Sequence, residues 1–525
     1  EKISESLAVK LGKIIAVGET KKIKKFIGAH TKTIDLGGRT LILGLIDSHC
    51  HITSTAIRME GVLDLSEEAG IKSINDIKAK IAERVKKIDA GVWIQGARED
   101  EYKLQEKRHP TKWELDDAAP NNPVLISTVG GHFSIANSQA FESAGVTKDT
   151  PDPVGGKYER DPESGELTGG IHEKAASIIR RAKPAEKPLD REKIADMVKQ
   201  IMMKNASVGL TCIYDNAGAR EIRAALDLLA KKELPIRLRV DMPITNFAQL
   251  VRIGMNYRPF GNEWVKICGV KFFFDGAISA RTAAVSEPSL HRPNFYGVMA
   301  TTVDLAKKEI FNAYKEGCRI SAHANGDRAI SMYLDIMQEV QSQYPRANPR
   351  NRIIHCTVVN PELVDRISTL GLLPTLFGAY PYYHGYKLLP AFGEDRLEWT
   401  FASRSFLNAG VKVSAHSDYS ASPFPPLMGI HALVNRTTKA GEPIGRSQKI
   451  SVMEALRLYT INAAYQSFDE DRLGSIEEGK CADMVVLRED LLTVPEESIL
   501  DIPIEITIVN GQIVYEQKAR NSNAT

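Results

Sequence analysis

The sequence lacks a long hydrophobic run and any strong excess of charge of one sign. No apolar stretch approaches the roughly 20 residues that a membrane-spanning helix needs. The 68 Lys and Arg residues nearly balance the 66 Asp and Glu residues, which leaves a formal net charge of +2. This composition gives no reason to expect a nucleic acid or a membrane as a partner.

Cysteine is also scarce. The six cysteines stand singly, at positions 50, 212, 268, 318, 356 and 481. This is not the pattern of a disulfide framework, so we expect buried free thiols. No secretory signal opens the sequence as given, and a cytoplasmic protein is therefore expected.

Short β-type segments occupy both ends of the chain. Residues 6–17 predict two strands around Gly12, and residues 33–36 predict a third. Further strands are predicted at 483–487, 504–509 and 512–515, the last two joined by Asn510-Gly511, which is a strong hairpin signal. We therefore expect a small β-sandwich domain formed by residues 1–40 and 468–525.

The middle of the chain alternates strand-like and helix-like segments. The strand candidates lie at 41–51, 210–214, 236–242, 265–274, 319–323, 352–356, 371–376 and 411–416. Eight β-then-α units predict an α/β fold, a (β/α)8 TIM-type barrel in residues 41–60 and 180–467. Residues 61–179 are too many for a loop, so they predict an inserted lid subdomain after the first strand.

Histidines and an aspartate recur where the predicted barrel strands end. His49 and His51 are two residues apart, so on a strand their side chains point to the same face. His323, His355 and Asp418 end or follow later strands. Each residue alone is more often an ordinary polar group at a strand end. Together they predict a divalent-metal site, because carboxyl ends of barrel strands meet at one mouth and imidazole suits zinc.

Lys271 lies in an apolar strand, where a bare ammonium group is costly to bury. Two interpretations remain open. The side chain extends towards solvent or pairs with Asp275, or it is a modified lysine that acts as an anionic metal ligand.

Several motifs resemble those of the amidohydrolase superfamily (amidohydrolase 3), in particular the branch of YtcJ-like, N-substituted formamide deformylase-like enzymes. The resemblance covers nearly the whole chain. Its motifs are GLIDSHCH at 44–51, VKFFFDG at 270–276 with RTA at 281–283, HANGDRA at 323–329, AHSD at 415–418 and GSIEEGKCAD at 474–483.

The resemblance implies a site of one or two divalent metal ions, zinc foremost, with a carboxylated Lys271 as the bridging ligand where two are present. The implied metal ligands are His49, His51, Lys271, His323, His355 and Asp418. It further implies that Asp418 moves the proton of a metal-activated water to the leaving nitrogen. His132, in GGHF at 130–133, is expected to contact the substrate or to stabilise an oxyanion, unless its role is structural.

The expected substrate pocket includes Asp275 and Arg281 from the fourth-strand signature. Tyr380 and Tyr383 belong to an aromatic segment after the seventh strand, which either lines the pocket or packs in the interior. Two positions depart from the family pattern. Leu43 stands where a proline is usual, and Ile354 replaces an acidic residue before His355. The substrate of any one relative is therefore not assigned to this protein.

The expected activity is hydrolysis of a non-peptide carbon–nitrogen bond, of amide, N-acyl or formamide type. One alternative is a single-metal deaminase of the same superfamily, although Lys271 is typical of a bridging ligand. The other is a catalytically silent metal-binding or regulatory homologue. A homodimer is expected only by analogy with the scaffold.

Overall fold

The computed structural model describes residues 3–129, 131, 133–153, 156–184, 189–246 and 259–517. The chain divides into two compact units. The larger unit comprises Glu1–Ser54 and Arg191–Thr525, and the smaller unit comprises Thr55–Asp190.

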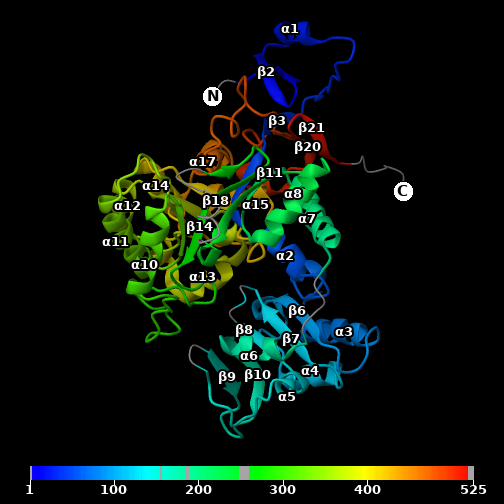
Figure 1. Cartoon of the computed structure of the whole chain (residues 1–525), viewed down its shortest axis with the longest axis vertical. Coiled ribbons are helices and arrows are strands. Elements are labelled where there is room, and N and C mark those ends of the chain that lie inside the picture. Colours follow the sequence, from blue (N-terminus) through cyan, green and yellow to red (C-terminus); the bar gives the residue numbers. More distant parts are fainter. Residues whose placement is uncertain are drawn as a thin grey trace. The chain divides into compact units, whose positions relative to one another are not determined.

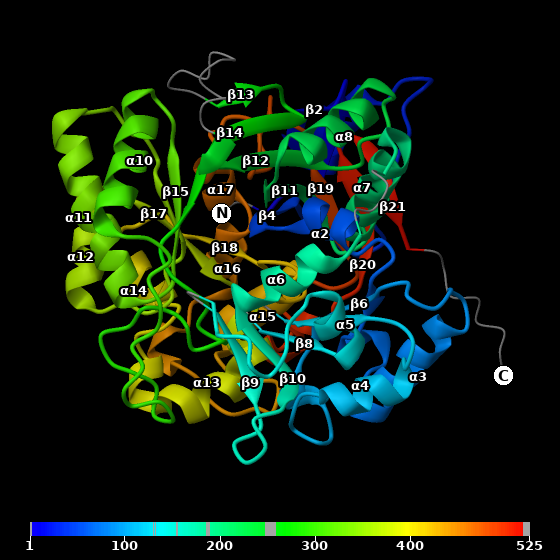
Figure 2. The ribbon, with the colours of Figure 1, turned by 60° about the horizontal axis from the view of Figure 1, so that its bottom comes forward.

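The larger unit contains eight parallel strands in the order β18-β17-β16-β15-β14-β12-β11-β4, with α-helices outside them (Figures 1 and 2). The strands are β4 (Leu45–Cys50), β11 (Leu210–Asn216), β12 (Arg237–Pro243), β14 (Val265–Phe273), β15 (Ile320–Ala324), β16 (Arg352–His355), β17 (Leu373–Phe377) and β18 (Ser414–His416). They form a nearly closed barrel, which confirms the predicted fold class, and each of the eight predicted segments overlaps one of these strands.

Backbone hydrogen bonds join the two ends of this barrel sheet. The amide of His51 donates to the carbonyl oxygen of Tyr419 at 2.7 Å, and the amide of Asp418 donates to that of His49 at 3.1 Å. These bonds connect the end of β4 to the segment after β18. They therefore hold His49, His51 and Asp418 beside one another at one mouth of the barrel.

The helices of this unit follow the strands in the chain, as a (β/α)8 barrel requires. They are α7 (Arg191–Ala206), α8 (Ala219–Ala230), α10 (Val303–Lys315), α11 (Asp327–Gln343), α12 (Pro361–Thr369), α13 (Tyr380–Leu397), α14 (Ser403–Asn408), α15 (Pro426–Asn435), α16 (Val452–Leu458) and α17 (Ile461–Gln466). In α7, for example, Ile194, Val198 and Ile201 recur at helical spacing and are buried.

The predicted first barrel strand is divided at Gly44. Its first part, β3 (Thr40–Leu43), pairs with β19 (Met484–Leu487) in a separate sheet, and only β4 enters the barrel. The Gly44 amide donates to the carbonyl oxygen of Asp483 at 2.8 Å. A Cβ at this position would lie 2.2 Å from Thr211 Oγ1, so the passage between the two sheets requires glycine.

Strands from both termini form the small antiparallel sheet, in the order β21-β20-β19-β3. β20 (Ile504–Val509) and β21 (Gln512–Glu516) form the predicted hairpin, and Asn510 and Gly511 have φ of 52° and 74°, as a type I′ turn requires. A second pair, β1 (Ser6–Lys10) and β2 (Lys13–Gly18), contributes Ile14 to the same core.

The strand predicted at residues 33–36 is wrong. The described chain has no strand there, and the segment is largely exposed. The Asp35 carboxylate accepts a hydrogen bond from the Gly37 amide at 2.9 Å, which stabilises a turn instead.

The smaller unit contains a six-stranded mixed sheet in the order β5-β6-β7-β8-β10-β9. Its strands are β5 (Leu63–Asp64), β6 (Ile94–Glu99), β7 (Val124–Thr128), β8 (Phe133–Ala136), β9 (Gly156–Arg160) and β10 (Leu167–Glu173). Its helices are α3 (Ile74–Val85), α4 (Lys112–Ala118), α5 (Ser138–Ser143) and α6 (Ala175–Ala182). The helix α2 (Ile52–Arg58) connects β4 to this unit. The role of the smaller unit as a lid stays a prediction.

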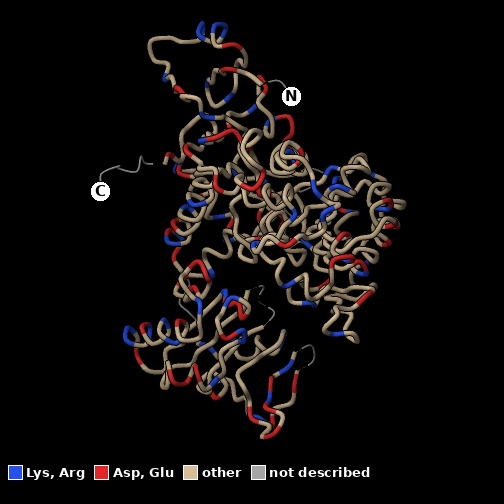
Figure 3. The backbone as a smooth tube through the Cα atoms, turned by 180° about the vertical axis from the view of Figure 1, so that it is seen from behind, with Lys and Arg blue, Asp and Glu red and all other residues tan. Residues whose placement is uncertain are grey.

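No helix in the described residues combines the length and apolarity that crossing a membrane requires. Basic and acidic residues are interspersed along the chain in Figure 3, in keeping with the small net charge.

Candidate metal centre

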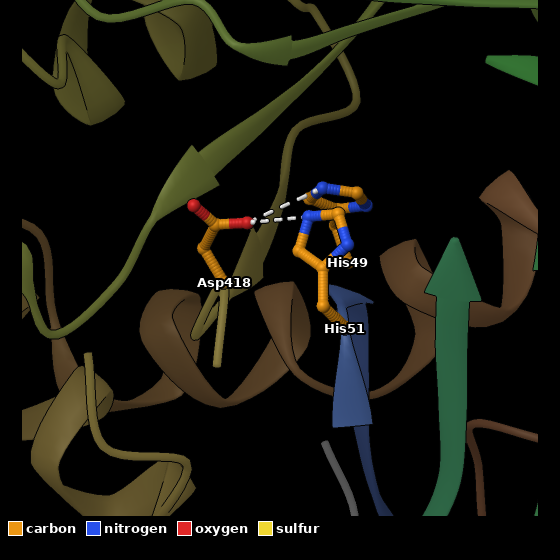
Figure 4. Close-up of side chains that lie close together, drawn as sticks. All are labelled: His49, His51 and Asp418. Atoms are coloured by element: carbon orange, nitrogen blue, oxygen red, sulfur yellow. Dashed lines mark ion pairs between the residues drawn. The ribbon is translucent and has the colours of Figure 1, made fainter. Parts of the chain in front are cut away.

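The predicted ligands His49, His51 and Asp418 converge at the mouth of the barrel (Figure 4). His49 Nε2 lies 3.4 Å and His51 Nε2 lies 3.3 Å from Asp418 Oδ1. One ligand atom from each residue lies within 4.8 Å of the other two. Three such donors around one point match the requirement of a zinc-like ion.

Lys271 reaches the same group from β14. Its Nζ lies 3.2 Å from His49 Nε2, and its side chain is buried. The side chain of Lys271 therefore lies inside the cluster and does not extend to solvent. The sequence left this choice open.

His355 and His323 lie next to this group. His355 Nε2 is 3.0 Å from His323 Nδ1, and the ring centroids of His49 and His355 are 5.6 Å apart. His323 Nε2 also lies 3.1 Å from both the carbonyl oxygen of Gly276 and Asn325 Nδ2. All six predicted ligands are thus in one region of the larger unit.

His416 is a further imidazole of this region that the sequence analysis assigned no role. It ends β18, is fully buried, and lies with its ring 5.4 Å from His49 and 5.1 Å from His355. His355, His416 and Asp418 also each offer a ligand atom within 4.8 Å of the others. Its position two residues before Asp418, on a strand that ends at the site, was the available signal.

Several buried polar atoms of the cluster have no hydrogen-bond partner in the described part of the chain. They are Asp418 Oδ1, His355 Nδ1 and both ring nitrogens of His416. Buried polar atoms normally have partners, because each unmade bond costs about 1–3 kcal/mol. Lone pairs on imidazole and carboxylate that face one another are the donor set of a divalent cation, so these residues fit a metal.

Burial controls the charge of the cluster. It lowers the pKa of His49, His355 and His416 well below the ordinary value, and nearby Lys271 lowers each of them further. Neutral imidazole is the form that binds metal. Burial also lowers the pKa of Lys271 to about 7, against the opposing effect of Asp418 and Asp241.

The backbone at two of these residues is unusual. His355 and Asp418 have φ of 77° and 53°, in the left-handed region that non-glycine residues rarely adopt. Such strain often accompanies functional sites, where it sets the direction of a side chain.

A second layer of polar side chains lies in the barrel interior near Lys271. Arg352 Nη1 lies 3.2 Å from Asp241 Oδ2, and the hydroxyl of Tyr214 donates to Asp241 Oδ1 at 2.8 Å. All three residues are buried. The sequence analysis did not single out these residues, because polar residues inside a strand show no local pattern.

Asp275 accepts hydrogen bonds from backbone amides of two loops, and its place in the substrate pocket stays a prediction. Its carboxylate accepts hydrogen bonds from the amides of Ala284, Asn325 and Gly326 at 2.8–2.9 Å. Asp275 therefore joins the loops after β14 and β15, and one of its oxygens lies 3.6 Å from His323 Nε2. Arg281 follows in the same loop, is partly buried and has a φ of 57°.

Tyr380 packs in the interior. Its ring contacts Phe377 at 4.3 Å and His384 at 4.5 Å, and it is 2% exposed. Tyr383, on the same helix, is partly buried and lies edge-on to His384 at 4.7 Å. Interior packing is one of the two roles that the sequence left open for this segment, and a place of Tyr380 or Tyr383 in the substrate pocket stays a prediction. His132 lies outside the described residues, so its role stays a prediction.

The smaller unit contains a separate group of possible ligands, Glu99, Glu101 and His109. His109 Nδ1 lies 2.9 Å from Glu99 Oε2, so an ion pair accounts for this group.

Comparison with known proteins agrees with this geometry. The model of the Amidohydrolase family (Amidohydro_3) matches residues 32–515. Putative amidohydrolase YtcJ of Bacillus subtilis (strain 168) is 28% identical, with 98% of this chain and 96% of YtcJ covered. N-substituted formamide deformylase of Arthrobacter pascens is 28% identical, with 98% and 95% covered. The crystal structure of an uncharacterized metal-dependent hydrolase from Pyrococcus horikoshii OT3 has the same fold, with a TM-score of 0.74, 24% identity and 93% and 94% of the two chains covered. The chain belongs to the amidohydrolase family.

Proposed function

We propose that this protein is a metal-dependent hydrolase that cleaves a non-peptide carbon–nitrogen bond of amide, N-acyl or formamide type. The observation that carries the proposal is the group of facing ligand atoms from His49, His51 and Asp418, with Lys271 beside them. The 28% identity to an N-substituted formamide deformylase supports the substrate class. A small-molecule substrate follows from this class, and the homodimer stays a prediction.

His49, His51, Lys271, His323, His355 and Asp418 are the proposed metal-binding residues. When bound, a divalent ion lowers the pKa of a coordinated water and polarises the substrate carbonyl. Zinc fits the imidazole-rich set best.

Asp418 is the proposed carrier of the proton. Its Oδ1 faces His49 and His51, and its other oxygen points away from both rings in Figure 4. As water adds to the carbonyl carbon, Oδ2 accepts the water's proton. It then donates this proton to the leaving nitrogen as the carbon–nitrogen bond breaks, which yields a carboxylic acid and an amine.

Lys271 is proposed to be carboxylated. With a pKa of about 7, a large share of its side chain is neutral amine at physiological pH. A neutral amine adds to CO2 and loses one proton, which forms a carbamate anion. The carbamate would be an anionic ligand beside His49 and would help to hold a divalent ion when one is bound.

The test uses metal-free and Zn²⁺-loaded protein on a panel of N-substituted formamides and acyl anilides, with amine release as the readout. Turnover should depend on the metal. Asp418→Asn should lower kcat by about 10²–10⁴-fold because it removes the proton carrier. Asp365→Asn, at an exposed position of α12, is the matched control.

Other outcomes separate the alternatives. Full turnover by metal-free protein would defeat the proposal. Ammonia release from aminated heterocycles, without acyl-amine cleavage, would identify a deaminase. Bound metal without turnover on any substrate would identify a catalytically silent homologue.

A further inference from the structure

His416 is the last residue of β18 and lies beside the proposed metal centre. Its backbone pairs in register with Phe377 of β17, and its carbonyl oxygen accepts from the Gly378 amide at 2.9 Å. The Phe377 ring lies 4.5 Å from the imidazole. The backbone and one ring contact therefore fix the side chain within the barrel.

The two ring nitrogens of His416 have no hydrogen-bond partner among the described residues. His416 is 0% exposed, and neither ring nitrogen makes a hydrogen bond of normal geometry with any described residue. The side chains of Lys271, Arg352 and His51 act on the ring electrostatically, and the backbone of Thr375 interacts with it as well. A hydrophobic side chain of similar size would fill the same space without this cost, so packing alone does not explain a histidine here.

His416 belongs to one of the candidate ligand groups of the metal centre. His355, His416 and Asp418 each offer one ligand atom, and these atoms lie within 4.8 Å of one another. His49, His51 and Asp418 form a second such group, and Asp418 is common to both. Two groups that share a carboxylate have the arrangement of a site for two ions.

We propose that His416 is itself a metal ligand, which holds a second divalent ion together with His355 and Asp418. This inference rests on the proposed function only in that it requires metal binding. It adds an imidazole to the ligands expected from the sequence and leaves the assignment of His323 unchanged. The second ion would lie beside the one held by His49 and His51.

The test is a titration of metal-free protein with Co²⁺, followed by calorimetry and by the visible absorption of the bound ion. Wild-type protein should bind two ions per chain. His416→Asn should bind the second ion at least about tenfold more weakly and change its absorption, because a lost ligand alters the coordination sphere. His431→Asn is the control, since His431 is buried on α15 outside the cluster.

A second measurement uses wild-type protein and does not depend on the folding of a variant. Nitrogen-15 NMR of labelled histidines counts the imidazoles whose resonances shift on addition of Zn²⁺. We expect His49, His51, His323, His355 and His416 to shift. Four shifted imidazoles, with unchanged Co²⁺ binding by His416→Asn and by the bulkier His416→Gln, would overturn the inference. If wild-type protein binds no metal at all, the proposed function fails as well.

Discussion

At the scale of single residues, Lys271 shows how burial prepares a side chain for chemistry. Its ammonium form is disfavoured by desolvation and by nearby Arg352, and favoured by Asp418 and Asp241. Desolvation is the largest effect and lowers the pKa to about 7. Near pH 7, the amine and ammonium forms of Lys271 are therefore populated to a similar extent.

Carboxylation of Lys271 gives the first prediction at this scale. Metal-loaded protein supplied with ¹³C-labelled bicarbonate should show one carbamate carbon resonance in its NMR spectrum. Lys271→Arg should lose the resonance, because guanidinium stays protonated and does not add to CO2. Lys387→Arg, at another buried lysine, is the control and should keep it. A resonance of the same intensity in Lys271→Arg would place the carbamate elsewhere.

The ligand residues could be predicted from the sequence because their signal is local. A histidine or aspartate at the end of an apolar run is visible in the chain, and the barrel brings all such ends to one mouth. The buried polar group near Lys271 could not be predicted in this way. Asp241, Arg352 and Tyr214 meet only in the folded barrel, from strands about 30–110 residues apart in sequence.

At the scale of elements, α14 and α16 are joined by one carboxylate. Glu454 belongs to the capping box of α16, where its Oε2 accepts from the amide and the hydroxyl of Ser451 at 2.8 and 2.9 Å. The guanidinium of Arg404 on α14 also donates to Glu454, from Nη1 to Oε1 at 2.9 Å and from Nη2 to Oε2 at 2.7 Å. The Arg404 hydrogen bond is the main cause that lowers the pKa of Glu454 to about 2.

This arrangement predicts a pH dependence of stability. The pKa of Glu454 is about 2 in the folded chain and 4.5 ordinarily, so the unfolded chain binds more protons between these values. The stabilisation is therefore complete above pH 4.5 and is lost as the pH falls towards 2. Glu454→Gln should lower the free energy of unfolding by about 1 kcal/mol at pH 7, since both partners are a third exposed.

Urea unfolding at pH 7, 4 and 3 tests this dependence. The difference between wild type and Glu454→Gln should shrink as the pH falls, whereas Glu362→Gln, exposed in the first turn of α12, should show little difference at any pH. A difference that is constant or grows towards low pH would contradict the assignment.

Element positions were predictable where hydrophobic periodicity and turn residues agree. The eight barrel strands and the Asn510-Gly511 hairpin are of this kind. The division of the first strand at Gly44 was not, because its apolar run continues through both sheets and only the close approach of Thr211 reveals the change. The strand expected at 33–36 failed because Asp35 forms a local turn.

At the scale of the larger unit, Asp483 connects the barrel to the sheet formed by the two termini. Its carboxylate accepts hydrogen bonds from Nε and Nη2 of Arg237 on β12, at 2.7 and 3.0 Å, and from the amide of Asn510 at 2.8 Å. Its carbonyl oxygen accepts from Gly44, where the chain enters the barrel. Both ionic side chains are almost fully buried. The end of the chain thus stabilises the start of the barrel.

Arg237→Met should lower the free energy of unfolding by about 3–5 kcal/mol, because it leaves the Asp483 carboxylate buried without a counter-charge. Combining it with Asp483→Asn should recover part of this loss. The amide carries no charge, and its oxygen can still accept from Asn510.

Denaturant unfolding of wild type, the single variant and the double variant makes the comparison. If the pair couples the terminal sheet to the barrel, both should unfold in one transition in the wild type. A single variant that loses less than about 1 kcal/mol, or a double variant less stable than the single one, would show that the ion pair does not hold these parts together.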